Sequence, residues 1–337
     1  MSGVDNATAL TAGDVPMTDT PAAGRLWLGG LAASVAWLAA AALSAGWPDA
    51  DEWARTGEFA SLLAVFGGTL AFAAPTLRWF GGVGERLRSA APWLVVLALG
   101  LIGWEVVTAK LDLLPRPFFA PPQALLEVYL DEWPRLIECT VASCKLLLLG
   151  YAIGAAVGFT TGVAIGWSRA VGYWVNPVLR LIGPLPATAW LPIAFFAFPS
   201  SWSASVFLIA LATGVPVTIL TWSGVAAVNP AYYDIARTLG ASNRFLVHKV
   251  AVPAAMPHVF VGAFMGLTYA FVVLIVAEML GVKAGLGWYL QWSQGWAAYG
   301  NMYAALLIMA VLCSGLITLL FTVRDHLLAW QKGLLRW

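Results

Sequence analysis

Charged residues are scarce in this chain. They make up 10% of the 337 residues, with 18 Lys and Arg against 17 Asp and Glu, whereas soluble domains carry about 25%. A soluble core of this apolarity would need a polar surface that the sequence cannot supply, so the composition excludes an ordinary soluble domain. We also expect no nucleic acid among the partners of the chain.

Metal-binding and phosphate-binding patterns are missing as well. The three cysteines lie in or beside apolar stretches without metal-ligand spacing, so we interpret them as packing residues and predict no metal site. They are Cys139, Cys144 and Cys313. No stretch reads G-x-x-x-x-G-K followed by Ser or Thr, the glycine-rich backbone that cradles phosphate. The chain should therefore not hydrolyse ATP, and we predict neither catalytic residues nor a cofactor in it.

Long apolar runs dominate what is present. Hydrophobic residues make up 61% of the chain, and about 20 apolar residues let a helix cross roughly 30 Å of hydrocarbon. We predict an all-α polytopic membrane protein with about eight transmembrane helices. The predicted spans are Leu26 to Gly46, Phe59 to Leu77, Ala91 to Ala109, Leu136 to Trp167, Trp190 to Phe198, Ala204 to Val228, His258 to Leu280 and Tyr303 to Val323. The fifth is the weakest, because prolines interrupt it.

The loops predict an orientation for these spans. With the N-terminus inside, the cytoplasmic loops hold roughly twice as many Lys and Arg residues as the outer loops, so the positive-inside rule places both termini in the cytoplasm. Residues 1–25 are polar and lack the basic start of a cleaved signal peptide, so we interpret them as a disordered cytoplasmic tail. Residues 324–337 form the predicted C-terminal cytoplasmic tail.

A glycine stripe marks the fourth predicted span. Glycine recurs every four residues, and this spacing places the glycines on one slowly drifting face where another helix can approach backbone to backbone. The members are Gly150, Gly154, Gly158, Gly162 and Gly166. Static helix packing and a face along which helices slide are both compatible with this pattern.

A polar segment, residues 229–253, lies between two apolar runs near the C-terminal end. Pro230 suits the first turn of a helix with Asn229 as its N-cap, Gly240 can end that helix, and Asn243 can cap a second one that reaches Val250. Composition alone is equally satisfied by an ordinary solvated loop. The spacing of particular residues in this segment favours a specific role in binding another protein.

The segment resembles the signature loop of permease subunits in bacterial ATP-binding-cassette importers, E-A-A, three residues, G, nine residues, then I-x-L-P. Asp234, Ile235 and Ala236 take the first places, Gly240 the glycine, and the stretch from Val250 to Pro253 the end. Asp234 and Ile235 depart conservatively from Glu and Ala. From about Leu114 to Lys332 the chain looks like the branch that handles nitrate, bicarbonate, cyanate, taurine and alkanesulfonates. The stretches that carry this likeness are LPRPFFAPP, NPVLRLIGPLPATAWLPIAFF, ARTLGAS and AEMLGVKAGLGW.

The resemblance implies a type I importer permease core of about six helices, residues 91–323, preceded by an extension with two additional helices, residues 26–90. It also implies the partners: a second permease copy, two ATPase subunits that bind ATP and Mg, a periplasmic binding protein, and the lipid of the bacterial inner membrane. The coupling loop, residues 229–253, would seat on the ATPase. Its coupling residues would be Asp234, Ala236, Arg237, Leu239, Gly240 and Ala241.

Ionisable residues in spans are costly and therefore candidates for function. Lys145, if it faces the pore, would attract an anion, although its long stem can also reach the outer interface. Glu105 and Glu278 fall near span ends, where we expect them to reach water, and Glu278 also belongs to the AEMLG element of the resemblance. Thr188 and Trp190, in the proline-broken segment, are further pathway candidates, because irregular backbone at membrane depth is tolerated where it lines a cavity.

Three function classes are compatible with the sequence. The leading one is the permease of an ATP-driven importer for a small anion such as a sulfonate, taurine, nitrate or bicarbonate. A self-sufficient secondary transporter or channel would show inverted repeats, and the sequence has no convincing one. A membrane scaffold or receptor would leave the spacing of the coupling loop as coincidence. The sequence does not rank the anions.

Overall fold

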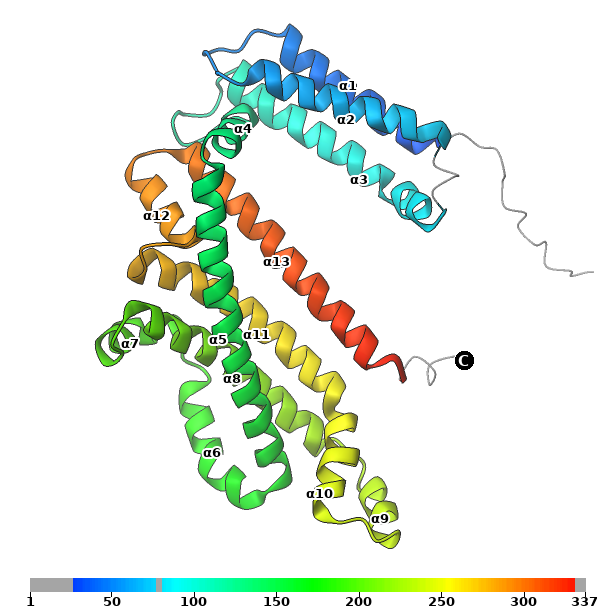
Figure 1. The fold of residues 1–337 in the computed structure, drawn as a ribbon, viewed down its shortest axis with the longest axis vertical. Coiled ribbons are helices and arrows are strands. Elements are labelled where there is room, and N and C mark those ends of the chain that lie inside the picture. The colour runs from blue at the N-terminus through cyan, green and yellow to red at the C-terminus, as the bar shows by residue number, and fades with distance from the viewer. Residues whose placement is uncertain (1–26, 77–80, 331–337) are drawn as a thin grey trace, which may run out of the picture. The chain divides into compact units, whose positions relative to one another are not determined.

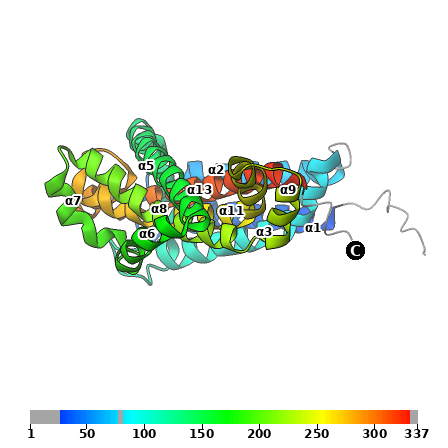
Figure 2. The same cartoon turned by 90° about the horizontal axis from the view of Figure 1, so that it is seen from below.

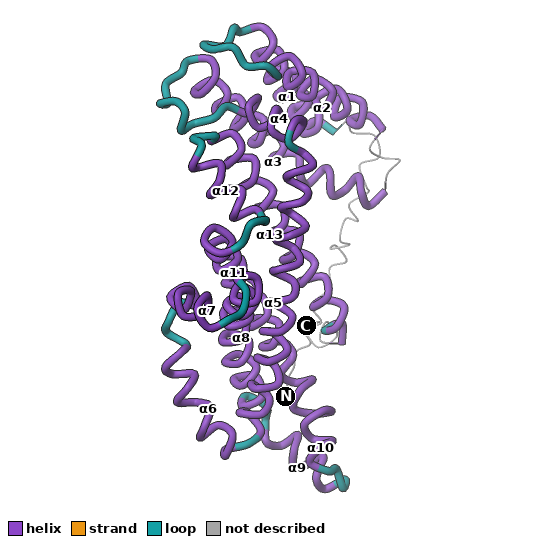
Figure 3. Tube along the Cα trace, turned by 60° about the vertical axis from the view of Figure 1, so that its left-hand side comes forward, coloured by secondary structure: helices purple, strands orange, loops and turns teal. Residues whose placement is uncertain are grey.

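The computed structural model describes residues 27–76 and 81–330, and every regular element in that part of the chain is a helix (Figure 3). Seven helices there are long and apolar enough to cross a membrane, or up to eight if one bent pair counts as a span. The predicted all-α polytopic membrane fold is therefore confirmed. The predicted tail of residues 1–25 and the last residues of the C-terminal tail lie outside the described residues.

The fifth predicted span is interrupted by prolines, as the sequence indicates, and its residues form the second half of a bent helix pair. Helix α6 (Arg169–Ile182) is followed by a 3₁₀ turn, η3 (Ala187–Trp190), and the short helix α7 (Leu191–Ala197). The two halves of this pair meet at 89°. Pro184 and Pro186 stand in the break, where proline removes a backbone donor and biases the preceding residue away from the helical region.

The chain divides into two compact units (Figure 1). The first ends at Lys110 and the second continues from Leu111, with Glu52–Arg55 added to it. The first unit contains α1 (Leu28–Gly46), α2 (Thr56–Thr76), α3 (Gly81–Glu105) and a π-helical turn, η2 (Val106–Lys110). The third long helix thus groups with the first two, while the functional boundary at residue 90 stays a prediction.

Side-chain to backbone hydrogen bonds hold the helices of the first unit together. The hydroxyl of Ser34 donates to the carbonyl of Gly67 at 2.7 Å, which joins α1 to α2. The indole of Trp37 donates to the carbonyl of Leu94 at 3.0 Å, which joins α1 to α3. A carbonyl oxygen can accept a second hydrogen bond in addition to the one inside its own helix. These two bonds therefore link neighbouring helices and also pair the buried donors of Ser34 and Trp37.

The second unit is built around α8 (Ser201–Ala226). This helix packs against both α5 (Trp133–Trp167) and α11 (Val252–Gly281), and α5 and α11 also contact each other (Figure 2). The remaining helices of the unit are α4 (Pro122–Asp131), α9 (Pro230–Thr238), α10 (Asn243–Phe245), the π-helical η4 (Leu246–Ala251), α12 (Leu286–Gly295) and α13 (Tyr299–Leu327).

The five predicted packing glycines of α5 all face α8. A Cβ atom added at Gly154 would lie 2.4 Å from the carbonyl oxygen of Ala210, and one at Gly158 would lie 2.6 Å from that of Gly214. Atoms cannot approach so closely, so any side chain at these positions would push the two backbones apart. The stripe therefore sets the distance between α5 and α8 over about four helical turns.

Candidate functional site

Helix α9 begins at the residues that the sequence predicts. The side chain of Asn229 accepts a hydrogen bond from the backbone N–H of Ala231 at 3.0 Å, and Pro230 occupies the first helical position. Gly240 has a φ of 79°, the left-handed conformation that ends helices and that glycine adopts without a steric penalty. The predicted start and end of this helix are confirmed.

The segment after Gly240 differs from the prediction. Ser242, rather than Asn243, is the N-cap, and its hydroxyl accepts from the N–H of Phe245 at 3.4 Å. The second helix also does not stop at Val250, because α10 continues through the π-helical η4 directly into α11. The turn at Gly240 is therefore followed by helical structure that runs to Gly281.

One face of α9 is exposed and apolar. Tyr232 and Ile235 are each 60% exposed and Leu239 is 83% exposed, and their spacing places them on one ridge of the helix. Asp234 and Arg237 lie beside the ridge with 3.9 Å between their charged atoms, both largely exposed, so this pair adds little to stability. An amphipathic helix with anchors at this spacing is the kind that docks in a groove of another protein.

The opposite side of α9 is tied to the membrane helices. The ring of Tyr233 meets the ring of Trp167, at the end of α5, edge to face with 5.9 Å between centroids. Beneath them, Ala251 and Ala255 pack with Val225 of α8 in a small buried cluster. The helix that carries the exposed ridge therefore packs against the ends of α5, α8 and α11. Figure 1 shows α9 at its lower end.

The pathway candidates separate into different environments. Thr188 lines a cavity of about 480 Å³, whose other walls come from the turn at residues 183–187 and from α8 and α11. Trp190 does not line this cavity and instead packs against the hydrophobic core formed by α5, α8 and α11. Lys145 lines a second cavity, which also contains Lys283. The structure does not bring the four predicted pathway residues into one site.

Glu278, the fourth candidate, is fully buried, so the expectation that it reaches water is wrong. Its Oε2 atom accepts from the hydroxyl of Ser143 at 2.9 Å and from the backbone N–H of Gly287 at 2.8 Å. Ser143 in turn accepts from the N–H of Leu286 at 2.8 Å. Among the described residues, Oε1 of Glu278 has no hydrogen-bond partner. The carboxylate thus anchors the turn between α11 and the start of α12 to α5.

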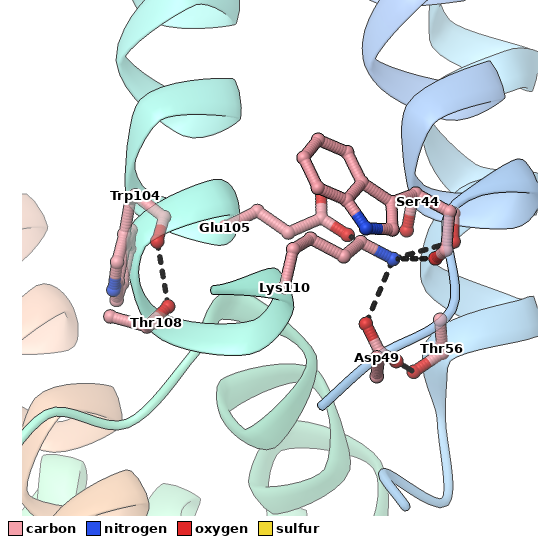
Figure 4. A network of polar contacts seen from close by, with 8 residues as sticks. Ser44, Asp49, Thr56, Trp104, Glu105, Thr108 and Lys110 are labelled. Atoms are coloured by element: carbon pink, nitrogen blue, oxygen red, sulfur yellow. Dashed lines mark hydrogen bonds and ion pairs between the residues drawn. The ribbon is translucent and has the colours of Figure 1, made fainter. Parts of the chain in front are cut away.

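Glu105 is also buried rather than exposed, and it lies beside an unexpected partner, Lys110 (Figure 4). The ammonium of Lys110 lies 2.8 Å from Asp49 and 3.6 Å from Glu105, and it donates to the carbonyl of Ser44 at 3.0 Å and to that of Trp47. The π-helical turn places Glu105 and Lys110 on the same side. This cluster closes the end of the three-helix unit.

A second polar cluster, around α12, has no counterpart in the sequence predictions. The phenol of Tyr289 donates to Glu132 at 2.6 Å, and the amide of Asn301 donates to the other oxygen of Glu132 at 2.8 Å. Burial, and then the hydrogen bond to Glu132, raise the pKa of Tyr289. Glu132 and Tyr289 are 157 residues apart in the sequence, so no local pattern could reveal their contact.

The comparison with known families decides what kind of protein carries these features. Residues 154–332, which include the coupling loop, the bent helix pair and Glu278, match the family described as binding-protein-dependent transport system inner membrane component. The chain belongs to this family. It is an inner-membrane, multi-pass permease component of an ATP-binding-cassette transporter, and the resemblance noted in the sequence is confirmed.

Two curated relatives illustrate the match. The nitrate import permease protein NrtB of Synechococcus elongatus is 26% identical over 265 residues, which are 73% of this chain and 89% of the relative. The bicarbonate transport system permease protein CmpB of the same species is 33% identical over 203 residues, 58% of this chain and 69% of the relative. A distant structural likeness, with 14% identity and a TM-score of 0.48, is to the inward facing MetNI methionine ABC transporter and covers 55% of this chain and 92% of that chain.

Family membership settles the broad alternatives. Permeases of this kind work with a binding protein, and in such systems the ATPase is a separate subunit. The chain is therefore not an enzyme by itself, and a self-sufficient transporter or a scaffold without transport is set aside. The roles assigned to individual residues stay predictions.

Proposed function

We propose that this permease imports a small anion and that α9 transmits the conformational change of the ATPase to the membrane helices. The single observation that supports the coupling role is the exposed apolar ridge of Tyr232, Ile235 and Leu239. The helix that carries this ridge packs on its other side against α5, α8 and α11. The exposed side of such a helix can bind the ATPase, and its buried side can transmit a movement of the ATPase to three membrane helices.

The proposed orientation places α9 and both termini in the cytoplasm. This follows from the distribution of Lys and Arg among the loops. The ATPase subunits, each with bound ATP and Mg, would then receive α9 with Asp234, Ala236, Arg237, Leu239, Gly240 and Ala241 at or beside the contact. The binding protein would approach the opposite end of the unit, where α12 lies.

The proposed translocation pathway forms between two copies of the chain. In each copy the cavity beside Thr188 lies between the break that separates α6 from α7 and the helices α8 and α11. The break at Pro184 and Pro186 supports this location, because non-helical backbone at membrane depth is stable only where it is buried in protein or lines a cavity. Trp190 and Glu278 would not line the pathway. They would support the helices around it from within the packed core.

The proposed substrate class rests on the relatives. NrtB and CmpB are described as permeases for nitrate and bicarbonate, and Lys145 supplies a cation in a cavity of this chain. Taurine and alkanesulfonates belong to the same proposal, since a sulfonate offers a lysine the same charged oxygen atoms.

Reconstitution tests the proposal. The permease is purified with the ATPase encoded beside its gene, placed in lipid nanodiscs, and assayed for ATP hydrolysis with binding proteins loaded with nitrate, bicarbonate, taurine or an alkanesulfonate. We expect one loaded binding protein to raise the hydrolysis rate severalfold over the same protein unloaded.

Two results would contradict the proposal in different ways. One result is a stable complex whose ATP hydrolysis responds only to a binding protein loaded with a cation or a neutral solute. That result would contradict the proposal that the substrate is an anion. A permease that forms no complex with any co-encoded ATPase would remove the coupling role of α9.

A further inference from the structure

Two lysines that are far apart in the sequence line one cavity of the second unit. Lys145 comes from α5 and Lys283 from the turn between α11 and α12. The cavity has a volume of about 690 Å³, within the range of small-molecule sites. It lies at the N-terminal end of α8, the end remote from α9.

The walls of the cavity are fixed by regular structure and by the buried Glu278. On α5, Glu138, Val141, Ala142 and Lys145 follow one another at helical spacing, so a single face of that helix forms one wall. The opposing wall is the stretch of residues 281–284, directly before the turn that Glu278 anchors through Gly287. Lys283 thus lies in a short stretch between the end of α11 and this anchored turn.

The cavity carries an excess of positive charge. Neither Lys145 nor Lys283 has a carboxylate within 4.0 Å among the described residues. The lining therefore holds two ammonium groups and one acid, Glu138. The lining also includes Ser201 at the start of α8, and the dipole of that helix adds a partial positive charge at this end. These groups together favour an anion.

The rest of the lining is apolar, and this feature restricts the kind of anion that the cavity would bind well. Val141, Leu146, Trp202 and Val282 present hydrocarbon and aromatic surface beside the two lysines. Nitrate and bicarbonate have no apolar part to place against such a wall, whereas an organic sulfonate or carboxylate places its charged end on the lysines and its chain or ring on the wall.

We infer that this cavity is a receiving site for an organic monoanion, a sulfonate or carboxylate with an apolar body, bound by Lys145 and Lys283. The inference rests on the proposed function as an anion importer and names its substrate class. It places the site where a solute delivered at the end opposite α9 enters the permease.

Cysteine chemistry in the cavity tests the inference without knowledge of the natural substrate. Ser201→Cys introduces a thiol in the exposed lining, in a chain whose three native cysteines are replaced by alanine. The full chain in nanodiscs, with and without its ATPase, reacts with an anionic or a cationic methanethiosulfonate reagent, with hexanesulfonate, nitrate or neutral hexanol as protectants. Gly295→Cys, at an exposed position with open space around it, is the matched control.

We expect the anionic reagent to react faster than the cationic one at residue 201, and the double change Lys145→Gln with Lys283→Gln to reduce that ratio by about tenfold, while the ratio at residue 295 stays constant. Hexanesulfonate should protect at a concentration several times lower than nitrate, and only when the lysines are present.

If the ratio of anionic to cationic reaction rates at residue 201 does not change after both lysines are removed, the cavity is not an anion site. If nitrate and hexanesulfonate protect equally well, the ligand is not specifically an organic anion. Both readings are made on the permease itself. Failure of the ATPase to assemble is detected separately in the same preparations and bears on the proposed function instead.

Discussion

Glu278 and Ser143 lie 135 residues apart in the sequence, and the hydroxyl of Ser143 donates a 2.9 Å hydrogen bond to the carboxylate of Glu278. The same carboxylate accepts from Gly287. Gly285, in the turn before it, has a φ of 140°, and a Cβ atom there would lie 2.5 Å from the carboxyl carbon of Glu278. The turn between α11 and α12 is therefore wrapped closely around a single buried side chain.

Replacement of Glu278 should loosen this turn. Glu278→Ala leaves the Ser143 hydroxyl and the Gly287 N–H buried without an acceptor, which we expect to lower the free energy of unfolding by about 3 kcal/mol. Glu278→Gln keeps one acceptor oxygen and should cost about half as much. Thermal unfolding of the purified permease in detergent measures both. Equal stability of Glu278→Ala and the native chain would contradict the anchoring role.

The glycine stripe predicts a sharp difference between glycines. Gly154→Ala forces a methyl group toward the backbone of Ala210 and should destabilise the second unit by about 1–3 kcal/mol. Gly68→Ala, in α2, is the matched control, because a Cβ atom there meets nothing within 4 Å and alanine favours helix by up to about 1 kcal/mol. Thermal unfolding should separate the two, and equal effects would mean that the α5–α8 distance does not depend on the stripe.

The Lys110 cluster predicts that one lysine stabilises the first unit. Lys110→Ala leaves Asp49 and Glu105 without their shared cation, and breaking a buried ion pair in this way costs about 3–5 kcal/mol. Arg116→Ala, which removes an exposed pair with Asp112, should cost less than about 1 kcal/mol. Protection of amide hydrogens in α1 and α3 from exchange is the measurement, and unchanged protection in Lys110→Ala would contradict the interpretation.

The sequence predicts those features whose causes are local. The cap at Asn229 and Pro230, the left-handed Gly240 and the periodic glycines each depend on residues within a few positions. Apolar run length predicts the membrane class for the same reason, because one segment of helix carries the whole signal. The bend of α6 against α7 is indicated by prolines, but its 89° angle depends on the surrounding helices.

The features that the sequence misses depend on partners from distant segments. Lys110 looks like a loop lysine until Asp49 and the end of α1 are placed against it. Glu278 looks like a residue at a span end until Ser143 and Gly287 enclose it. Lys283 attracts no attention in the sequence, because its significance comes from the cavity that it shares with Lys145.

The most direct measurement of the central claim is the affinity of the permease for its ATPase when the ridge of α9 is cut back. Leu239 is 83% exposed, so Leu239→Ala should leave thermal stability unchanged and weaken binding by about tenfold or more if Leu239 is an anchor in the ATPase groove, since anchor residues contribute about 2 kcal/mol or more. Leu280→Ala, with 66% exposure at the far end of α11, is the matched control and should bind normally. Equal affinities of the Leu239→Ala and native permeases for the ATPase would contradict the assignment of α9 as the coupling helix.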